Sequence, residues 1–352
     1  MSTEQQKTKM QYVRLGKSGL KVSKIILGCM SYGSPEWQPW VLGEEESIKH
    51  IKAAYDAGIN TFDTANIYSD GESERILGKA IKQLELPRDG IVVLTKLWGI
   101  VKRDYKEPQY MQNNELADSV GYANQYGLSR KHIFESVKHS LERLQLDYID
   151  VLQCHRFDPN TPIEETMQAL HDVVQAGYVR YIGMSSCFAY QFHAMQNYAI
   201  TNKLTPFISM QNHHNLIYRE EEREMVPTLN LFGVGSIPWS PLARGLLCRP
   251  LAALGDTKRG SVDRIVKGYS FGEGTEKIVA KVEEIAKKRG VSMAQVALAW
   301  IASRPGVSAP IVGTTSLENL ADLIAGLDIE LTEEEVKELE EPYEAQKVYG
   351  HW

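Results

Sequence analysis

The sequence predicts an α/β fold: a (β/α)8 TIM barrel with long loops after strands 3 and 7 and a C-terminal helix. Two observations support this prediction. Eight short apolar segments rich in β-branched residues alternate with eight longer amphipathic segments. Each short segment is almost continuously apolar, which is typical of parallel strands that helices cover on both faces. An open doubly wound sheet is the alternative, but eight such units fit a closed barrel better.

The predicted strands are short runs bounded by polar residues or glycine. They cover residues 24–28, 59–63, 91–96, 148–153, 179–185, 206–211, 233–239 and 309–313. The predicted helices carry apolar residues at helical spacing. They cover residues 45–57, 72–84, 130–144, 163–175, 190–200, 220–231, 275–288 and 317–325. Gly58 and Gly177 suit left-handed helix ends, and Ser129 suits an N-cap.

Three segments lie outside this alternation. Residues 97–128 and 241–274 follow the third and seventh strands and are longer than ordinary loops. Because barrel enzymes build their sites at the carboxyl ends of strands, we interpret both as substrate-gating loops, with a disordered insertion as the alternative. The acidic segment after Leu331 predicts one more helix and a tail. A single domain over residues 1–352 is expected.

Composition excludes several classes of protein. Of 352 residues, 43% are hydrophobic and 24% are charged, which excludes collagen, coiled coils and general disorder. The 39 basic and 45 acidic residues give a charge of −6, so no nucleic-acid partner is expected. The polar N-terminus and the absence of a long apolar run predict neither a signal peptide nor a membrane span. The widely spaced Cys29, Cys154, Cys187 and Cys248 suit reduced thiols in the cytoplasm.

Sequence motifs for common cofactors and metals are missing. The chain has no GxGxxG after its first strand, no P-loop, no HExxH and no cysteine or histidine cluster at zinc spacing. His213 and His214 are the only histidine pair, and adjacent residues of a strand point to opposite faces. We therefore expect chemistry without a metal.

Polar residues close three successive predicted strands. Asp63 ends the second strand, Lys96 ends the third and His155 lies just beyond the fourth. Tyr68 follows Asp63 by five residues and can fold back over the same rim of the barrel. A structural salt bridge is the alternative for any one of these residues, but it explains the whole set poorly.

This set of side chains suits proton donation to a carbonyl group. A lysine ammonium close to Tyr68 would stabilise the phenolate, and Asp63 would hold Lys96 charged. Tyr68 would then be a general acid, and His155 would hold the carbonyl oxygen. Since no protein group supplies a hydride, the set implies a nicotinamide cofactor.

Several motifs resemble the aldo-keto reductases, in particular the fungal and bacterial aryl-alcohol dehydrogenase-like branch. They are GINTFDTANIYSDGESERILGKAI, VVLTK, DVLQCHRFD, YVRYIGMSS, SMQNHHNLIYREEEREMVP, IPWSPLARGLL and PIVGTTSLENL. The similarity spans about residues 12–345. It implies a barrel that binds NADP(H) without a Rossmann domain and reduces aldehydes or ketones. It assigns catalysis to Asp63, Tyr68, Lys96 and His155, the four residues found at the strand ends.

The resemblance also implies cofactor contacts. Ser185, Ser186 and Gln211 would bind the nicotinamide carboxamide, and Trp239 would stack on the ring. Ser240, Leu242 and Arg244 would line the pyrophosphate, with Arg244 as a cationic donor. The backbone at Gly313 and Thr314 and the following helix would bind a phosphate. The complete expected set is Gly28, Cys29, Met30, Asp63, Ser185, Ser186, Gln211, Trp239, Ser240, Leu242, Arg244, Gly313, Thr314, Thr315, Ser316 and Asn319.

One departure from the family pattern concerns the 2′-phosphate of NADP. Related sequences often have a lysine or arginine soon after the position of Gly313, where this chain has Ser316, and an arginine or histidine where it has Asn319. A charge-assisted hydrogen bond is worth about 1.5–3 kcal/mol, so the preference for NADP over NAD would fall roughly ten- to a hundredfold. Lys258 or Arg259 would be able to compensate. NADP(H) remains the expected cofactor.

The leading functional hypothesis is NADP(H)-dependent reduction of aromatic or other hydrophobic aldehydes and ketones. Aromatic residues of the loops would line a flat apolar pocket or, alternatively, pack the loops onto the barrel: Trp37, Trp40, Trp98, Tyr105, Tyr110, Tyr122 and Tyr126. A reductase dedicated to one secondary-metabolite carbonyl is the second hypothesis. The third is a cofactor-sensing binding module like the potassium-channel β subunits, which resemble the same family. No oligomeric state is predicted.

Overall fold

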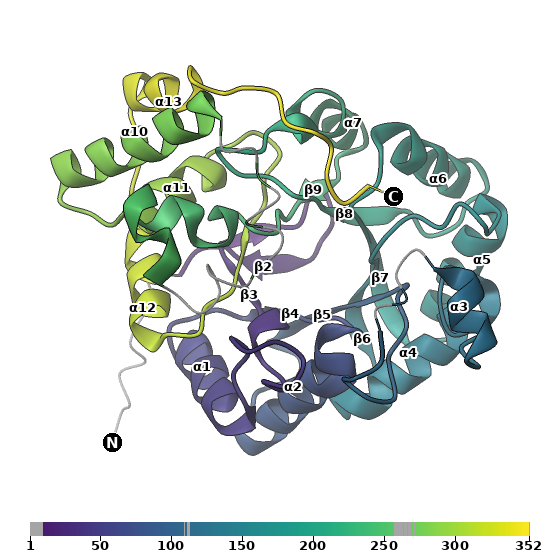
Figure 1. Cartoon of the computed structure of the whole chain (residues 1–352). Helices are drawn as coiled ribbons and strands as arrows, with labels where there is room; N and C mark the ends of the chain where they lie inside the picture. Colours follow the sequence, from purple (N-terminus) through teal and green to yellow (C-terminus); the bar gives the residue numbers. More distant parts are fainter. Residues whose placement is uncertain are drawn as a thin grey trace, which may run out of the picture.

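The computed structural model of the protein describes residues 10–108, 110, 113–256, 263, 266, 269 and 272–351. Eight parallel strands form one sheet in the order β10–β3–β4–β5–β6–β7–β8–β9, inside a ring of helices (Figure 1). Backbone hydrogen bonds close the sheet into a barrel. The Ser236 amide donates to the Gly306 carbonyl at 2.9 Å, and the Ser308 amide donates to the Ser236 carbonyl at 2.8 Å. The predicted barrel is confirmed.

All eight predicted strands occur, although the first two and the last two are each at least two residues shorter than predicted. The strands are β3 (Ile26–Gly28), β4 (Thr61–Asp63), β5 (Val92–Leu97), β6 (Ile149–Cys154), β7 (Val179–Ser185), β8 (Phe207–Gln211), β9 (Gly235–Ser236) and β10 (Ile311–Val312). The prediction placed the end of β9 at residue 239. Pro238 has no N–H group to donate to a neighbouring strand. Pairing with the segment that follows β8 continues as an isolated bridge between His213 and Trp239, in which the Trp239 amide donates to the Asn212 carbonyl at 2.9 Å.

The eight predicted helices also occur. They are α1 (Glu44–Asp56), α2 (Glu72–Gln83), α4 (Arg130–Leu144), α5 (Ile163–Gln175), α6 (Ala189–Thr201), α7 (Met225–Phe232), α10 (Glu273–Arg289) and α12 (Leu317–Ala325). The predicted start of the sixth helix at residue 220 is wrong. Glu220–Glu222 form a separate 3-10 turn, and α7 begins at Met225. This start puts Pro227 in the first helical turn, where its missing N–H has no cost.

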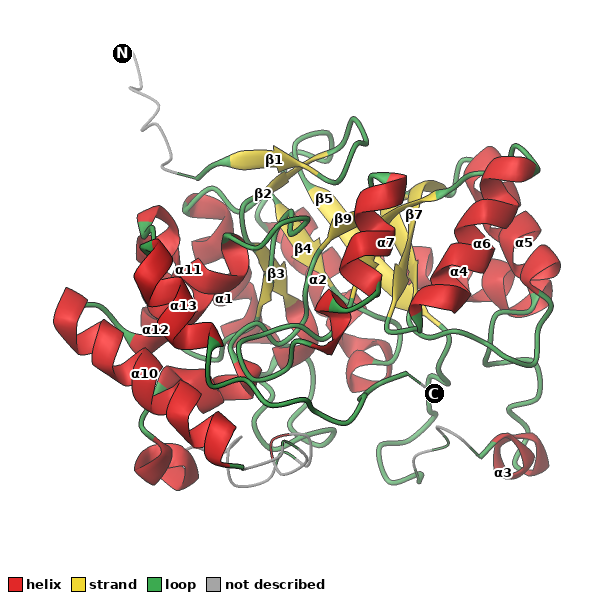
Figure 2. Cartoon of the chain, turned by 90° about the horizontal axis from the view of Figure 1, so that it is seen from above, coloured by secondary structure: helices red, strands yellow, loops and turns green. Residues whose placement is uncertain are grey.

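Some elements were not predicted. They are the hairpin of β1 (Tyr12–Arg14) and β2 (Lys21–Ser23), the short helix α3 (Asn114–Ser119) and the helix α11 (Met293–Ala302). Most of α11 is buried, including Trp300, so its sequence lacks the polar face that reveals a helix by periodicity. The C-terminal helix is confirmed as α13 (Glu333–Glu340). The hairpin lies at one end of the barrel, and α3 and the C-terminus lie at the other (Figure 2).

The hairpin closes the amino end of the barrel. Leu15, in its turn, is fully buried in an inner apolar cluster with residues such as Leu94 and Ile237. Gly16 has a φ of 58°, and a Cβ atom there would lie 2.5 Å from the amide nitrogen of Gly235. This close approach requires glycine. Side chains therefore fill the interior of the barrel at its amino end.

The loop between β5 and α4 is folded at the carboxyl end. Tyr110, Ala117 and Tyr122 form a small apolar cluster of their own. The carboxylate of Glu107 accepts hydrogen bonds from the hydroxyl groups of Tyr110 and Tyr122, each at 2.8 Å. A disordered insertion is thus not supported for the described residues of this loop.

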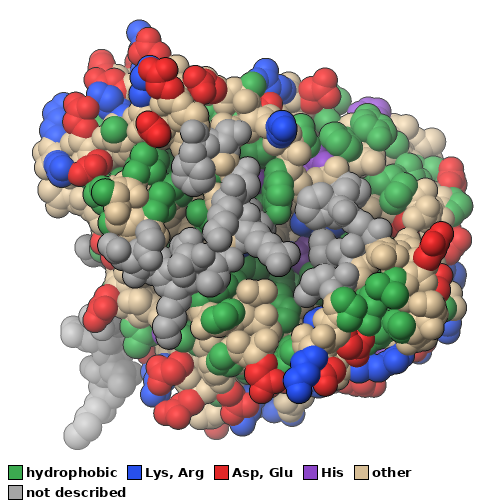
Figure 3. All heavy atoms as spheres, in the orientation of Figure 1, with side chains coloured by type: hydrophobic (Ala, Val, Ile, Leu, Met, Phe, Trp, Pro, Cys, Tyr) green, Lys and Arg blue, Asp and Glu red, His purple; other side chains and the backbone are tan. Residues whose placement is uncertain are grey.

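On the face at the carboxyl end, the side chains near the centre differ in type from those at the rim. Viewed from this end, charged side chains gather over the outer helices, and hydrophobic ones lie nearer the centre (Figure 3). Among the described residues, no helix has the length and apolar character needed to cross a membrane.

Candidate active site

Three of the predicted catalytic residues meet at the carboxyl end of the barrel. The Lys96 ammonium donates hydrogen bonds to Oδ2 of Asp63 at 2.6 Å, to the Thr64 carbonyl at 2.8 Å and to the Tyr68 hydroxyl oxygen at 3.3 Å. These acceptors use all three N–H bonds of the ammonium. Since the Tyr68 oxygen accepts in this contact, its own proton is directed elsewhere.

The register of the parallel strands brings these groups together. Asp63 pairs with Leu94 of β5, and Lys96 pairs with Gln153 of β6. Alternate side chains of a strand share one face. Lys96 therefore points into the barrel on the same side as Leu94, which belongs to the inner apolar cluster, and lies one layer closer to the carboxyl end.

Lys96 carries a buried positive charge. Its side chain is fully buried. Burial alone would lower the pKa of Lys96, but the charge of Asp63 and the contact with Tyr68 raise it above its ordinary value. A fixed cation therefore lies 3.3 Å from the Tyr68 oxygen, where it stabilises the negative charge that forms when this group loses its proton.

His155 completes the group of four. Its ring meets the Tyr68 ring edge to face, with 5.8 Å between the centroids. Burial, with smaller effects of Arg156 and Lys96, holds the pKa of His155 well below its ordinary value, so the ring is neutral at pH 7. Its buried Nδ1 has no hydrogen-bond partner in the described part of the chain. The fold thus assembles the four residues, and their catalytic roles remain a prediction.

Gln153 belongs to this group and was missed by the sequence prediction. Its amide donates to Oδ1 of Asp63 at 3.0 Å. The Gln211 amide donates to the same oxygen at 2.9 Å and to Oε1 of Gln153 at 2.9 Å. Asp63 therefore accepts hydrogen bonds from three side chains. A signal was present, because Gln153 lies two residues before His155 and such residues share a strand face.

Tyr68 begins a strained turn that ends at Gly71. Ser69 (φ 48°, ψ 41°) and Asp70 (φ 50°, ψ 44°) both have left-handed backbones. This conformation costs about 1–2 kcal/mol for each residue other than glycine, so neighbouring contacts have to stabilise it. Ser69 is fully buried, and its hydroxyl oxygen accepts a hydrogen bond from the Ser34 amide at 3.2 Å.

The predicted carboxamide contacts are neighbours. The Ser185 hydroxyl donates to the Gln211 carbonyl at 2.7 Å. The indole N–H of Trp239 donates to the Ser186 hydroxyl oxygen at 3.0 Å. Asn212, also missed by the sequence prediction, accepts a hydrogen bond from the Ser186 amide at 2.8 Å. This bond supports Ser186 in its left-handed conformation, which has a φ of 39°.

Trp239 is part of a stack of rings. The His213 ring lies parallel to the indole with 4.1 Å between centroids, and the Tyr218 ring lies parallel to His213 at 4.3 Å. Burial holds the pKa of His213 well below its ordinary value, so this ring is neutral. Since His213 covers one face of Trp239, a nicotinamide ring stacked on Trp239 has to use the other face.

The turn after Trp239 has an unusual backbone. Ser240, Ala243, Arg244 and Gly245 have φ values of 51°, 47°, 56° and 99°. The amides of Ala243 and Gly245 donate to the carbonyls of Ser240 and Leu242 at 2.9 Å and 3.0 Å, so these two N–H groups are used within the turn. The pyrophosphate contact expected for this stretch stays a prediction.

Two predicted contacts in this turn have other partners as well. The Arg244 guanidinium forms an ion pair of 2.6 Å with Asp263, so its charge is shared with a carboxylate. The Leu242 side chain is partly buried against the core. Lys258 and Arg259, considered above as compensating cations, lie outside the described residues.

The ends of β3 and β10 lie side by side. A Cβ atom on Gly313 would be 3.3 Å from the Gly28 carbonyl oxygen. The thiol of Cys29 is buried and donates weakly to the Leu27 carbonyl at 3.8 Å, and burial raises its pKa. Cys29 thus faces the core, which leaves its backbone and the half-buried Met30 for the expected cofactor contact.

The start of α12 offers neutral donors. The Ser316 hydroxyl oxygen accepts from the Asn319 amide at 3.2 Å, and Oγ1 of Thr314 accepts from the Ser316 amide at 3.1 Å. Thr315 is exposed, and the carboxylate of Glu318 lies 3.5 Å from the Ser316 hydroxyl. A 2′-phosphate here would meet hydroxyl and amide groups and a nearby negative charge.

The loop aromatics fall into two groups. Trp37 lies beside Tyr68, with 6.4 Å between ring centroids, and Trp98 directly follows β5. The others pack the loops: Trp40, Tyr105, Tyr110, Tyr122 and Tyr126. Packing of the loops is therefore the role of the second group, and Trp98 also packs against the core. That Trp37 and Trp98 line a substrate pocket stays a prediction.

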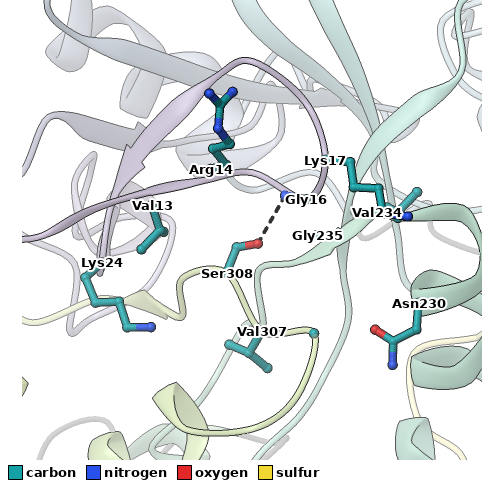
Figure 4. A pocket seen from close by; sticks show the side chains of 12 residues that line it. Val13, Arg14, Gly16, Lys17, Lys24, Asn230, Val234, Gly235, Val307 and Ser308 are labelled. Atoms are coloured by element: carbon teal, nitrogen blue, oxygen red, sulfur yellow. Dashed lines mark hydrogen bonds between the residues drawn. The ribbon is translucent and has the colours of Figure 1, made fainter.

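A groove at the amino end of the barrel is separate from this site. It lies between the hairpin turn, Lys24, the start of β9 and residues 306–308 (Figure 4). Across it the Gly16 amide donates to the Ser308 hydroxyl oxygen at 3.3 Å. No predicted site residue lines this groove.

The chain belongs to the aldo/keto reductase family, whose model matches residues 24–344. This assignment makes the protein an oxidoreductase of a family that acts on carbonyl compounds or alcohols with nicotinamide cofactors.

Similar curated proteins come from fungi. A Schizosaccharomyces pombe protein named as an aryl-alcohol dehydrogenase is 52% identical over 94% of this chain and 95% of its own length. Versiconal hemiacetal acetate reductase of Aspergillus parasiticus is 51% identical over 95% of this chain and 97% of its own length. An aldo-keto reductase of Fusarium vanettenii is 48% identical over 98% of this chain and 94% of its own length.

Proposed function

We propose that the protein is an NADP(H)-dependent reductase that converts aromatic or otherwise hydrophobic aldehydes and ketones into alcohols. The observation that carries this proposal is the buried Lys96 ammonium, hydrogen-bonded to both Asp63 and Tyr68. The family gives the class of reaction, and the contacts at the carboxyl end support the roles that we propose for the residues.

The donors and acceptors at the ends of β7 and β8 suit a nicotinamide carboxamide. Gln211 uses both amide N–H bonds on Asp63 and Gln153, so its Oε1 is the atom that accepts from the carboxamide. Ser185 gives its proton to a backbone carbonyl and acts as a further acceptor. Ser186 donates its hydroxyl proton. When bound, the nicotinamide supplies the hydride.

Tyr68 is the proton donor in this proposal. Because Lys96 donates to the phenol oxygen, the proton of Tyr68 is directed to the substrate carbonyl oxygen, where negative charge develops. The charge of Lys96 then stabilises the phenolate, and Asp63 keeps Lys96 charged. The neutral His155 donates a hydrogen bond to the same substrate oxygen.

We expect NADPH to be preferred to NADH by a modest factor. Ser316 and Asn319 offer hydrogen bonds but no positive charge to a 2′-phosphate. The lost charge-assisted bond corresponds to roughly a ten- to hundredfold smaller preference than a lysine or arginine would confer. The ratio of kcat/KM for the two cofactors measures this preference.

The test is the loss of absorbance of NADPH, with NADH in parallel, against substituted benzaldehydes. Tyr68→Phe removes the proton donor and little volume, and kcat should fall by about 10²–10⁴. Tyr148→Phe is the matched control. Its ring lies between the guanidinium groups of Arg88 and Arg180 before β6, at the amino end, and its activity should equal that of the wild type.

Full activity of Tyr68→Phe would contradict the assigned proton donor. A wild-type protein that binds NADPH but reduces none of these aldehydes would contradict the broad substrate range.

A reductase dedicated to one secondary metabolite is the second candidate. It is favoured by the 51% identity to versiconal hemiacetal acetate reductase. In this case the benzaldehydes react poorly and a polycyclic hemiacetal or ketone reacts well, while Tyr68→Phe abolishes both. We also propose that the protein acts as a single domain in the cytoplasm, which its four free cysteines support.

A further inference from the structure

The turn that carries Tyr68 is held by the segment that follows β5. Oδ1 of Asp70 accepts a hydrogen bond from the Lys102 amide at 3.2 Å, and its Oδ2 lies 3.6 Å from the Lys102 ammonium. These two side chains are only 7% and 5% exposed. The Tyr105 hydroxyl donates to the Ser69 carbonyl at 3.2 Å. Two adjacent left-handed residues are thus supported from another loop.

Lys102 also organises its own loop. Its ammonium donates to the carbonyl oxygens of Tyr105 at 3.3 Å and Glu107 at 3.2 Å. Glu107 in turn accepts hydrogen bonds from two tyrosines of the apolar cluster in this loop. Burial raises the pKa of Asp70, and the charge of Lys102 opposes that shift. The pair therefore connects the strained turn to the folded part of the loop.

The contact between Lys96 and Tyr68 depends on this turn. The bonds from Lys96 to Asp63 and Thr64 are 2.6 Å and 2.8 Å long and join groups at the ends of adjacent strands. The bond to Tyr68 is longer, at 3.3 Å, and its acceptor lies on the turn. A shift of the turn would therefore weaken the contact with Tyr68 and leave the other two intact.

We propose that Asp70 and Lys102 are positioning residues, which hold the strained turn so that the Tyr68 hydroxyl stays in contact with Lys96. Through them the loop after β5 is coupled to proton donation. This inference rests on the proposed function and adds to it two residues outside the group of four.

The experiment compares Asp70→Ala with Asp70→Asn. Asp70→Ala removes both contacts to Lys102, and kcat should fall about tenfold, because a small displacement of a catalytic group is costly. The solvent deuterium isotope effect on kcat should rise, since proton transfer becomes slower. The Kd for NADPH should change less than about twofold, because the cofactor contacts are elsewhere. Asp70→Asn keeps an acceptor for the Lys102 amide and should retain most of kcat.

Asp150→Ala is the matched control. This carboxylate also accepts a backbone amide, that of Val93 at 2.8 Å, and pairs with Arg88 at 2.7 Å, but it lies near the amino end of the barrel. Its loss should lower the Tm and leave kcat and the isotope effect of the folded enzyme unchanged. If Asp70→Ala behaves in the same way, the inference is overturned.

If Asp70→Ala does not fold, Lys102→Met tests the same inference. This variant should lower kcat and raise the solvent isotope effect. If kcat and the isotope effect both equal those of the wild type, the inference is overturned. An inactive wild-type enzyme would contradict the proposed function and this inference together. If the wild type is active and the variants have the same kcat and the same isotope effect, only the inference about Asp70 and Lys102 is contradicted.

Discussion

Among single residues, Asp63 has the widest influence on the site. One of its oxygens accepts from Lys96, and the other accepts from Gln153 and Gln211. The same carboxylate therefore holds the cation beside the proposed proton donor and the amide that we expect to contact the cofactor. A substitution of Asp63 should therefore affect both the contact between Lys96 and Tyr68 and the position of the Gln211 amide.

Asp63→Asn should lower kcat about a hundredfold and also lower the Tm. An amide offers one acceptor oxygen and brings two N–H groups, so it faces three donors with too few acceptors. It also leaves Lys96 as a buried cation without its anion, which is strongly destabilising. Steady-state kinetics and thermal unfolding measure both effects. Asp150→Asn is the control, and equal behaviour of the two variants would contradict a special role of Asp63.

At the scale of elements, the C-terminal segment is tied to the loop after β8. Arg219 forms ion pairs with Glu222 at 2.7 Å and with Glu340 of α13 at 3.2 Å. The chain continues from α13 to the site, where a Cβ atom on Gly350 would lie 3.7 Å from the Trp239 ring. The ion pair with Glu340 therefore holds α13 against the loop after β8, and the residues that follow α13 reach the carboxyl end of the barrel.

Stability should fall in acid through Glu222. Burial alone would raise the pKa of Glu222, but hydrogen bonds from His214 and Arg219 outweigh it and lower the pKa to about 2. A carboxyl group with a lowered pKa stabilises the fold above its ordinary pKa of about 4.3, and this stabilisation is lost as the pH falls toward 2.

Glu222→Gln should therefore be less stable than the wild type at pH 7, by about 1–2 kcal/mol after allowance for solvent screening. The difference should shrink between about pH 4 and pH 2. Urea unfolding at several pH values measures it, and a difference independent of pH would count against the role of this carboxylate.

At the scale of the whole molecule, the two ends of the barrel have different tasks. The hairpin and the inner apolar cluster fill the amino end, and the polar strand ends and loops form the carboxyl end. The candidate site thus lies at the carboxyl end, and the packed amino end contributes to stability. This arrangement is expected for barrel enzymes.

Leu15→Ala should destabilise the protein by about 2–5 kcal/mol, because it leaves a cavity at the fully buried base of the barrel. The kcat of the folded enzyme should stay near the wild-type value, since the base is remote from the site. Leu231→Ala, at a side chain that is 72% exposed, is the control and should change stability by less than about 0.5 kcal/mol. Equal stability of the two variants would show that the hairpin does not close the barrel.

Much of the fold could be predicted because apolar runs and amphipathic segments alternate along the chain. The barrel strands follow from short, almost continuously apolar runs, and the helices follow from apolar residues at helical spacing. The Ser129 N-cap is present, with its side chain accepting from the His132 amide. The hairpin strands, YVR and KVS, contain charged or polar residues and so form no apolar run. The buried α11 has no polar face, and the start of α7 depends on Pro227.

The sequence by itself determined the barrel and the four polar residues at its carboxyl end, because parallel strands all end at one rim and so bring their last residues together. Only the tertiary structure decided which atoms meet. Gln153 bonded to Asp63, Asn212 supporting Ser186 and Lys102 supporting the Tyr68 turn join residues far apart in the chain. Such contacts depend on side-chain direction and on distances of a few ångströms, which no local sequence pattern encodes.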